Sequence, residues 1–379
     1  RSTPIKSSAA LDVYKRQRKV LAVLLCAAMT AALAVGCGGS KGSDSSDKSS
    51  DSSSSSDDVI TVGFSQVGAE SDWRTANSQS MKDTFSKENG YDLIFDDAQQ
   101  KQENQITAIR NFIQQEVDYI LLAPVTETGW DTVLQEAKDA DIPVIIVDRM
   151  VDVSDDSLYT TWIGTDALCE GRKAAEWLNG FAEAKGIAAS DIHIADIQGT
   201  IGSTAQIGRT KGLEEGVDKY GWDLVAQQTG EFTQAKGQEV MESMLKQYDN
   251  INVVYCENDN EAFGAIDAIE AAGKTVGSDI ANGEIMVISF DTTHAGLQDV
   301  LDGKIECDVE CNPLHGPRAE ELIKKLEAGE DIDKLNYVDE EIFAHDDTVK
   351  SVKATNSLDE EKDFDVTPLT QDILDKRAY

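Results

Sequence analysis

Short apolar runs alternate with helical periodicity along most of this 379-residue chain. Four runs in the first half consist mainly of Val, Ile and Leu and lack the polar alternation of a half-exposed strand. They are Val59–Phe64, Asp92–Phe95, Tyr119–Ala123 and Val144–Val147. Such runs are typical of strands buried on both faces of a parallel sheet. Between two of them, Gln102–Val117 has Ile and Val at three- and four-residue spacing, which predicts an amphipathic helix.

The same alternation continues after Ile163. We expect helices at 166–182, 203–219, 234–248 and 259–272, and strands at 192–197, 223–228, 252–256 and 284–290. A C-terminal part with a helix at 294–302, a strand at 304–309 and a helix at 315–328 is too short for a third domain. Strands separated by helices of this length predict an α/β fold of two doubly wound, Rossmann-like units.

Polar side chains follow the predicted strands in both halves. Phe64 is followed by a polar segment up to Arg74, Val147 by Asp148 and Arg149, Cys256 by a segment containing Asn258, and Phe290 by Asp291. Ligands of open α/β sheets bind beyond the carboxyl ends of the strands, so two such sheets predict a ligand cleft between two lobes. Carboxylate, amide and guanidinium groups with a few aromatic rings suit a neutral ligand rich in hydroxyl groups.

The N-terminal region predicts an export signal with a lipid anchor. Two basic residues at 18–19 precede an apolar run at 20–35, and small residues lead to Cys37. This order resembles a bacterial lipoprotein signal, in which Cys37 becomes the lipidated N-terminus. An ordinary secretory signal or a buried helix is the alternative. Residues 1–17 have the composition of non-native sequence and are excluded from the fold prediction.

A serine-rich segment separates this signal from the predicted fold. Residues 38–58 contain 11 Ser and no apolar residue, so they cannot bury enough surface to offset chain entropy. We expect a flexible tether that holds the folded part outside the cell membrane without spanning it. No later segment offers the ~20 consecutive apolar residues of a spanning helix.

The charge balance excludes some classes of partner. The chain has 34 basic and 70 acidic residues, and loss of residues 1–36 leaves 28 against 69, a net charge of −41. Such a charge repels nucleic-acid phosphates and anionic lipid headgroups, and it opposes self-association. We therefore expect a monomer that binds no nucleic acid and meets the membrane only through its lipid.

The sequence contains no motif for nucleotide, metal or covalent chemistry. No G-x-x-x-x-G-K-[ST] occurs, and the glycines near 199–208 do not form G-x-G-x-x-G. The acidic run 257–261 lacks the spacing of a calcium loop, and no His is paired with a nucleophile. We expect no catalytic residue, no cofactor and no metal. The disulfide state of Cys169, Cys256, Cys307 and Cys311 stays open, with free thiols as the default.

A family resemblance covers residues 59–340 in register. It rests on the motifs at 62–68, 99–105, 123–125, 142–144, 148–149, 198–200, 209–212, 231–233 and 258–259. Together they resemble the sugar-binding proteins of bacterial ABC importers, in the ribose/galactose-type (type I) periplasmic-binding family, and most closely its galactofuranose-binding members. The resemblance implies two lobes joined by three crossovers, which close on a monosaccharide and deliver it to a permease and its ATPase.

The resemblance also implies the ligand contacts. They fall on Glu70, Ser71, Asp72, Trp73 and Arg74 in the first loop, on Asp148 and Arg149, and on Arg209, Asn258 and Asp291 in the second lobe. We expect Trp73 to stack on the ligand and Arg149 to donate two parallel hydrogen bonds to it, with pairing to Asp148 as the structural alternative. Glu257 and Thr292 depart from the family pattern, where His and Gly are usual, so the sugar and its ring form stay open.

The predicted lobes divide the chain at defined positions. The N-terminal lobe comprises 59–162 and 292–332, the C-terminal lobe 163–291 and 333–350, and a tail 351–379. A sensor that presents the closed form to a chemoreceptor or kinase is the alternative to transport. A lactose-type repressor would need an N-terminal helix-turn-helix in place of the serine-rich tether, and a glycosidase would need paired catalytic carboxylates.

Overall fold

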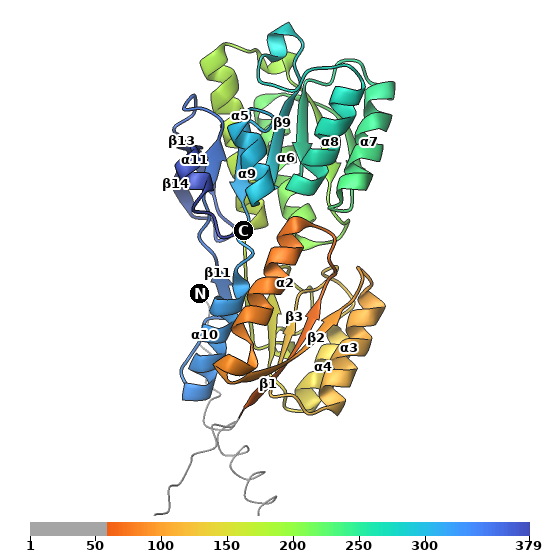
Figure 1. The fold of residues 1–379 in the computed structure, drawn as a ribbon, viewed down its shortest axis with the longest axis vertical. Coiled ribbons are helices and arrows are strands. Elements are labelled where there is room, and N and C mark those ends of the chain that lie inside the picture. The colour runs from red at the N-terminus through yellow and green to blue at the C-terminus, as the bar shows by residue number, and fades with distance from the viewer. Residues whose placement is uncertain (1–58) are drawn as a thin grey trace, which may run out of the picture. The chain divides into compact units, whose positions relative to one another are not determined.

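The computed structural model describes residues 59–379. The predicted signal, Cys37 and the whole of the tether lie outside these residues. Residues 60–320 and 334–379 form one compact unit, and 321–333, from the second half of α10 onward, lie outside that unit. The larger unit contains two lobes, each built on its own sheet (Figure 1). Within residues 59–379, no helix has the length and apolar character needed to cross a membrane.

The first lobe contains a six-stranded parallel sheet. Its strands are β1 (Ile60–Gln66), β2 (Tyr91–Asp97), β3 (Tyr119–Leu122), β4 (Val144–Val147), β5 (Thr161–Gly164) and β11 (Leu335–Tyr337), in the order β11-β5-β4-β3-β1-β2. Helices α2 (Asp72–Thr84), α3 (Gln102–Gln114), α4 (Asp131–Asp139) and the start of α10 (His315–Ala328) cover it. All side chains of β3 and β4 are buried, as their unbroken apolar sequences predict.

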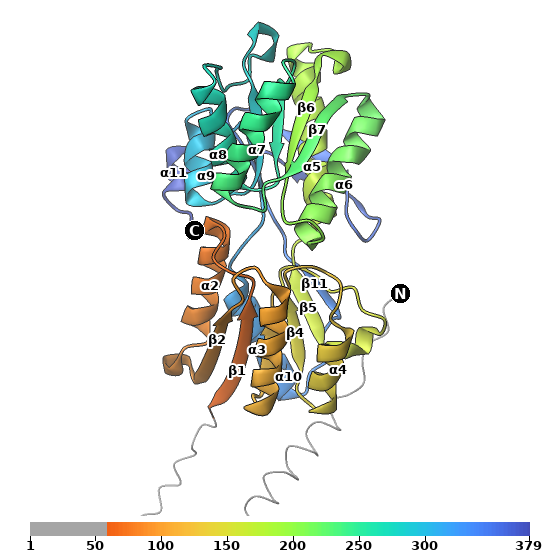
Figure 2. The ribbon, with the colours of Figure 1, turned by 90° about the vertical axis from the view of Figure 1, so that its right-hand side faces the viewer.

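The second lobe contains a seven-stranded sheet (Figure 2). Its strands are β6 (His193–Gln198), β7 (Asp223–Thr229), β8 (Val253–Cys256), β9 (Met286–Asp291), β10 (Cys307–Glu310), β12 (Ile342–Ala344) and β15 (Thr367–Pro368), in the order β15-β12-β10-β9-β8-β6-β7. The strand β12 runs antiparallel to β10, and the other pairs are parallel.

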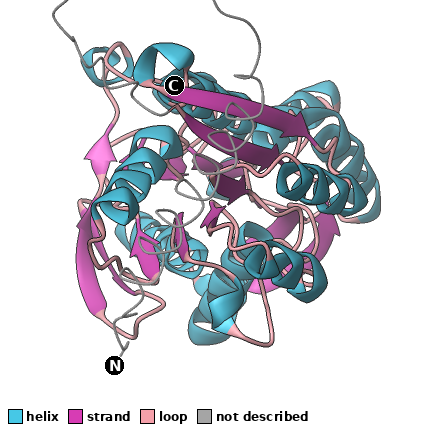
Figure 3. Cartoon of the chain, turned by 90° about the horizontal axis from the view of Figure 1, so that it is seen from below, coloured by secondary structure: helices cyan, strands magenta, loops and turns pink. Residues whose placement is uncertain are grey.

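Helices cover both faces of the second sheet, and Figure 3, which views the protein from below, shows helices packed around the strands. They are α5 (Ala167–Lys185) and α6 (Thr204–Tyr220) on one face, and α7 (Gln234–Gln247), α8 (Asp259–Ala271), α9 (His294–Leu301) and α11 (Gln371–Leu374) on the other. A hairpin of β13 (Ser351–Thr355) and β14 (Glu361–Asp365) packs on α5. Short 3-10 turns lie at Lys87–Asn89, Asp156–Leu158, Ala189–Asp191 and Ile280–Asn282.

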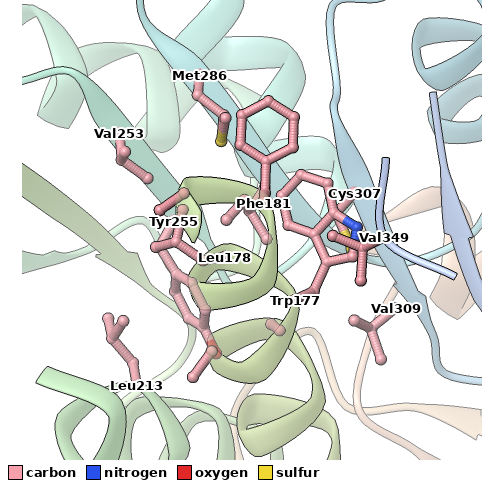
Figure 4. Close-up of a cluster of buried hydrophobic side chains, with 14 of the residues drawn as sticks. Trp177, Leu178, Phe181, Leu213, Val253, Tyr255, Met286, Cys307, Val309 and Val349 are labelled. Carbon is pink, nitrogen blue, oxygen red and sulfur yellow. The ribbon is translucent and has the colours of Figure 1, made fainter. Parts of the chain in front are cut away.

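The core beneath α5 shows why this helix forms where the sequence predicts it. Trp177 and Phe181 stack with their ring centroids 5.2 Å apart, and Leu178 lies on the same buried face (Figure 4). Tyr255 from β8 and Met286 from β9 complete this cluster. Residues three and four apart on a helix share a face, so this spacing buries one stripe of α5 against the sheet.

The chain crosses between the lobes three times, but two crossovers lie later than predicted. They follow β5, β10 and β11. β10 pairs with β9 in the second sheet, with Cys307 beside Ile288, so residues 292–310 do not belong to the first lobe. β11 pairs with β5, so the third crossover is at 338–341 and not at 333. Completely buried strands carry no pattern that assigns them to one sheet or the other.

The predicted C-terminal tail, residues 351–379, contains three strands and a short helix. Residues 351–365 form the β13–β14 hairpin, and 367–368 add the edge strand β15 beside β12. Alternation of buried and exposed side chains along β13, with Val352 and Ala354 buried, is the period-two pattern of a half-exposed strand. That pattern is present in the sequence of 351–355 and identifies the strand.

Candidate functional site

A pocket lies at the carboxyl ends of strands from both sheets. It encloses about 290 Å³ of space between atoms, part of which opens to solvent. Nine of the ten predicted ligand residues line it: Glu70, Ser71, Trp73, Arg74, Asp148, Arg149, Arg209, Asn258 and Asp291. Ala205, Phe232 and Cys311 complete the lining. Residues from distant parts of both lobes therefore meet where the fold predicts a ligand.

The first loop of the prediction is in fact a helix start. Ser71 is the N-cap of α2, and its Oγ accepts a hydrogen bond from the Arg74 backbone N–H at 3.1 Å. Trp73 and Arg74 therefore lie in the first turn, where α2 holds their side chains against the pocket. Asp72 is exposed and is not among the lining residues. Its backbone N–H donates to Asn260 Oδ1 of the second lobe at 2.9 Å.

A buried ion cluster forms the first-lobe wall. Arg74 Nη2 lies 2.8 Å from Asp148 Oδ2, and Arg74 Nε donates to Glu70 Oε1 at 2.9 Å. Burial lowers the pKa of Arg74, but the charges of Asp148 and Glu70 outweigh it, so the pKa is raised overall. Burial likewise raises the pKa of Asp148, and Arg74 and Arg149 reverse this and hold the pKa below its usual value. Arg74 and Asp148 therefore stay charged in the pocket.

Arg149 is the other guanidinium of this wall, and its contacts with carboxylates are long. Its Nη1 donates to the Val125 carbonyl at 2.9 Å. Its Nε lies 4.0 Å from Asp148, and its Nη2 lies 3.9 Å from Glu70. Burial and the neighbouring charge of Arg74 lower the pKa of Arg149 to about 10, so it is charged at neutral pH. Arg149 faces the pocket and presents N–H groups that can donate hydrogen bonds to a ligand oxygen.

Arg209 from α6 forms the opposite wall. Its Nε donates to Glu170 Oε2 at 2.7 Å, its Nη1 to the Glu257 carbonyl, and its Nη2 to Asp291 Oδ1 at 3.3 Å. Burial lowers the pKa of Arg209, but Glu170 and Asp291 outweigh this effect and raise the pKa well above its usual value. Burial raises the pKa of Asp291 in spite of Arg209. Arg209 is thus held rigidly, which fixes the direction of any hydrogen bond it gives to a ligand.

Phe232 is a pocket residue that the sequence analysis missed. Its ring lies beneath the Arg149 guanidinium, 5.2 Å from the guanidinium carbon to the ring centroid, although the two residues come from different lobes. Its backbone N–H donates to Glu261 Oε1 at 2.8 Å, and its carbonyl accepts from Asn258 Nδ2 at 3.2 Å. A Cβ on Gly199 would lie 1.9 Å from Phe232 Cζ, so the glycine makes room for the ring.

Three pocket residues adopt left-handed backbone conformations. The φ angles of Asp148, Phe232 and Asp291 are 66°, 60° and 105°. Such values are uncommon for residues with a Cβ and cost free energy that the surrounding structure must offset. Strain of this kind concentrates at binding sites, because it fixes side chains that an unstrained turn would direct elsewhere.

Trp73 is anchored at its edge. Its Nε1 donates to the Cys311 carbonyl, its ring lies edge-on to His315, and the Arg74 guanidinium carbon lies 4.5 Å from its centroid. Trp73 lines the pocket, and its stacking on a ligand stays a prediction.

The four cysteines within the described residues are buried free thiols, as the sequence analysis expects. They are Cys169, Cys256, Cys307 and Cys311.

Glu170, Cys311 and Glu340 have ligand atoms within 4.8 Å of one another, close enough for a metal ion. Two cationic side chains already face this cluster. Arg209 pairs with Glu170, and Lys173 Nζ donates to the Glu340 carbonyl at 3.3 Å. We therefore assign the cluster to holding Arg209 in place and not to metal binding.

The arrangement defines a class of protein: one that encloses a polar ligand between two lobes. The periplasmic binding protein domain family matches residues 62–315. The galactofuranose-binding protein YtfQ of Escherichia coli K12 is 38% identical over 304 residues, which cover 79% of this chain and 92% of that protein. The chain belongs to the periplasmic binding protein family, and like its relatives it is a binding protein and not an enzyme.

Solved structures agree with this assignment. A Mycobacterium smegmatis protein in complex with β-D-fucofuranose is 46% identical, with a TM-score of 0.71, over 76% of this chain and 92% of that one. The arabinose-transporter binding protein of Shewanella sp. ANA-3, bound to α- and β-L-arabinofuranose, is 44% identical, with a TM-score of 0.70, over 76% of this chain and 93% of that one. The two-lobed type I fold that the sequence predicts is confirmed.

Proposed function

We propose that this protein captures a neutral monosaccharide outside the cytoplasm by closing its lobes and delivers it to an ABC permease with its ATPase. The observation that carries the proposal is the position of Arg149, which faces the pocket between the lobes while Arg74 neutralises the nearby carboxylates. Three guanidinium groups and three carboxyl groups line the pocket. Their balance favours a neutral ligand whose hydroxyl groups both donate and accept hydrogen bonds.

We infer further that the sugar is bound as a furanose, galactofuranose or a related ring. Three relatives with 38–46% identity are named for galactofuranose or hold fucofuranose or arabinofuranose. Free sugars interconvert between ring forms, so the test needs locked rings. Calorimetric titration with 1,4-anhydro-D-galactitol, a locked five-membered ring, should give tighter binding than 1,5-anhydro-D-galactitol, which is its six-membered counterpart. Equal or reversed affinities would contradict the furanose assignment.

The residues around the pocket support the assignment of roles. We propose that Glu70, Ser71, Trp73, Arg74, Asp148 and Arg149 contact the sugar from the first lobe, and that Arg209, Phe232, Asn258 and Asp291 contact it from the second. Asp72 has no place in this set, because its side chain is exposed.

We also propose that Cys37 carries a lipid and tethers the protein to the outer face of the cell membrane, as the sequence predicts. The protein would act as a monomer there, because a net charge of −41 opposes association. In a host that processes lipoproteins, Cys37→Ser should move the protein to the soluble extracytoplasmic fraction. Retention of this variant in the membrane, unprocessed like the wild type, would contradict lipidation.

A further inference from the structure

Three hydrogen bonds join the lobes beside the pocket without any ligand. Thr204, the first residue of α6 in the second lobe, lies between two groups of the first lobe. Its Oγ1 accepts from the Met150 backbone N–H at 2.7 Å and donates to Glu127 Oε1 at 2.7 Å. The Glu127 backbone N–H donates to the Gly202 carbonyl at 3.0 Å. Movement of the lobes apart must break all three bonds together.

The same residues hold the turn that carries Arg149. Met150 follows Arg149 directly, and the Glu127 carbonyl accepts from the Asp152 backbone N–H at 2.7 Å. On the other side, Arg149 Nη1 donates to the carbonyl of Val125, two residues before Glu127. The Thr204 hydroxyl therefore holds the turn that carries Arg149, the side chain we propose to bind the ligand. Thr204 itself is not among the residues that line the pocket.

We propose that Thr204 and Glu127 are positioning residues that couple lobe closure to the placement of Arg149 and so control how long the sugar stays bound. The inference rests on the proposed function, because it takes the enclosed ligand to be the sugar. Encounter between sugar and open protein precedes these bonds, so they act on the dissociation rate and leave the association rate nearly unchanged. Loss of one hydrogen bond of ordinary strength corresponds to an increase of about three- to tenfold in the dissociation rate, and the Thr204 hydroxyl makes two such bonds, one of them to a carboxylate.

The first measurement is stopped-flow tryptophan fluorescence of the purified protein with L-arabinose as the probe. Thr204→Val keeps the shape of the side chain and removes the hydroxyl with both of its hydrogen bonds, so dissociation should become roughly ten- to 100-fold faster. Thr204→Ser keeps the hydroxyl and should restore the wild-type rate. Thr126→Val is the matched control, because Thr126 Oγ1 donates to Gln102 within the first lobe at 2.8 Å. The control should leave both rates unchanged.

The second measurement needs no sugar and separates this inference from the proposed function. Cys311 lines the pocket and is buried when the lobes are closed, so its labelling by N-ethylmaleimide reports opening. Peptide mass spectrometry of the ligand-free protein should show faster labelling of Cys311 in Thr204→Val than in the wild type or in Thr126→Val. Labelling of Cys256, which lies in the core of the second lobe, should be equal in all three.

Three results would overturn the inference: unchanged dissociation and labelling in Thr204→Val, an equal change in Thr126→Val, or failure of Thr204→Ser to restore the wild-type rate. Absence of sugar binding to the wild type would contradict the proposed function. In that case faster Cys311 labelling in Thr204→Val would still support the conclusion that these hydrogen bonds hold the lobes together.

Discussion

Asp148 is paired with Arg74 and not with the residue that follows it in the chain. The Asp148 carboxylate lies 2.8 Å from Arg74 and 4.0 Å from Arg149. The sequence places Asp148 and Arg149 side by side and leaves open whether they pair with each other. Because Arg74 pairs with this carboxylate, Arg149 is left to face the pocket, and the role in ligand binding that we propose for Arg149 rests on this difference.

Arg149→Ala should weaken sugar binding strongly. A hydrogen bond to a charged group contributes about 1.5–3 kcal/mol, so the affinity should fall roughly ten- to 150-fold. Arg149→Lys should recover only part of the loss, because an ammonium group cannot reproduce the planar fork of a guanidinium. Calorimetry measures the affinity of each variant. Circular dichroism provides the control, since both variants should remain folded.

Unchanged affinity in Arg149→Ala would remove Arg149 from the site. Its contacts with Val125, Asp148 and Glu70 would then be its whole role. A loss of folding in Arg149→Ala would leave Arg149→Lys as the informative variant, because it retains the positive charge between these groups.

Phe232→Leu should reduce sugar affinity roughly two- to tenfold, because it removes an aromatic face and keeps an apolar side chain of similar length. Gly199→Ala should have at least as large an effect, since its Cβ would overlap the Phe232 ring. Calorimetry with both variants tests the pair. If Gly199→Ala lowers the sugar affinity and Phe232→Leu does not, the backbone at residue 199 contributes to sugar binding and the Phe232 ring does not.

Asp196 should make the folded state less stable as the pH rises. Burial and the nearby charge of Glu214 raise its pKa to about 8 against the opposing hydrogen bond from Gln227. The folded protein therefore holds a proton that the unfolded chain releases near pH 4, so this group's contribution to stability is full below pH 4 and is lost as the pH rises to about 8.

Asp196→Asn removes this titration and should raise the unfolding temperature at pH 8, with a gain of at least about 1 kcal/mol from one pKa unit of difference. The gain should shrink towards pH 5. Asp218→Asn, at an exposed position of α6, is the matched control and should change the unfolding temperature little. Equal unfolding temperatures for Asp196→Asn and the wild type at pH 8 would show that ionisation of Asp196 does not destabilise the folded protein.

The sequence predicts the pocket because several of its polar residues come directly at or after the ends of predicted strands. Asp148 and Arg149 come directly after β4, and Asp291 is the last residue of β9, so the fold rule alone brings them together. Asp72 lies outside the pocket lining for a local reason. Ser71 caps α2, which directs Asp72 to solvent and Trp73 to the pocket. The capping serine is present in the sequence and identifies the helix start.

Other features depend on contacts that no local pattern carries. Phe232 follows Glu231 in two successive left-handed conformations, which are rare for residues with a Cβ and which sequence propensities do not anticipate. The Trp73 indole N–H reaches the carbonyl of Cys311, 238 residues away. The placement of β10 in the second sheet likewise depends on pairing with β9 and not on its own four buried residues.

The most direct test of the account is calorimetric titration of the purified wild type and Arg149→Ala with neutral monosaccharides, using L-arabinose, D-fucose and D-galactose in turn. The account predicts that at least one of them binds the wild type at one equivalent per chain, and that Arg149→Ala binds the same sugar roughly ten- to 150-fold more weakly. Absence of binding by all three sugars, or equal affinity of the wild type and Arg149→Ala, would contradict it.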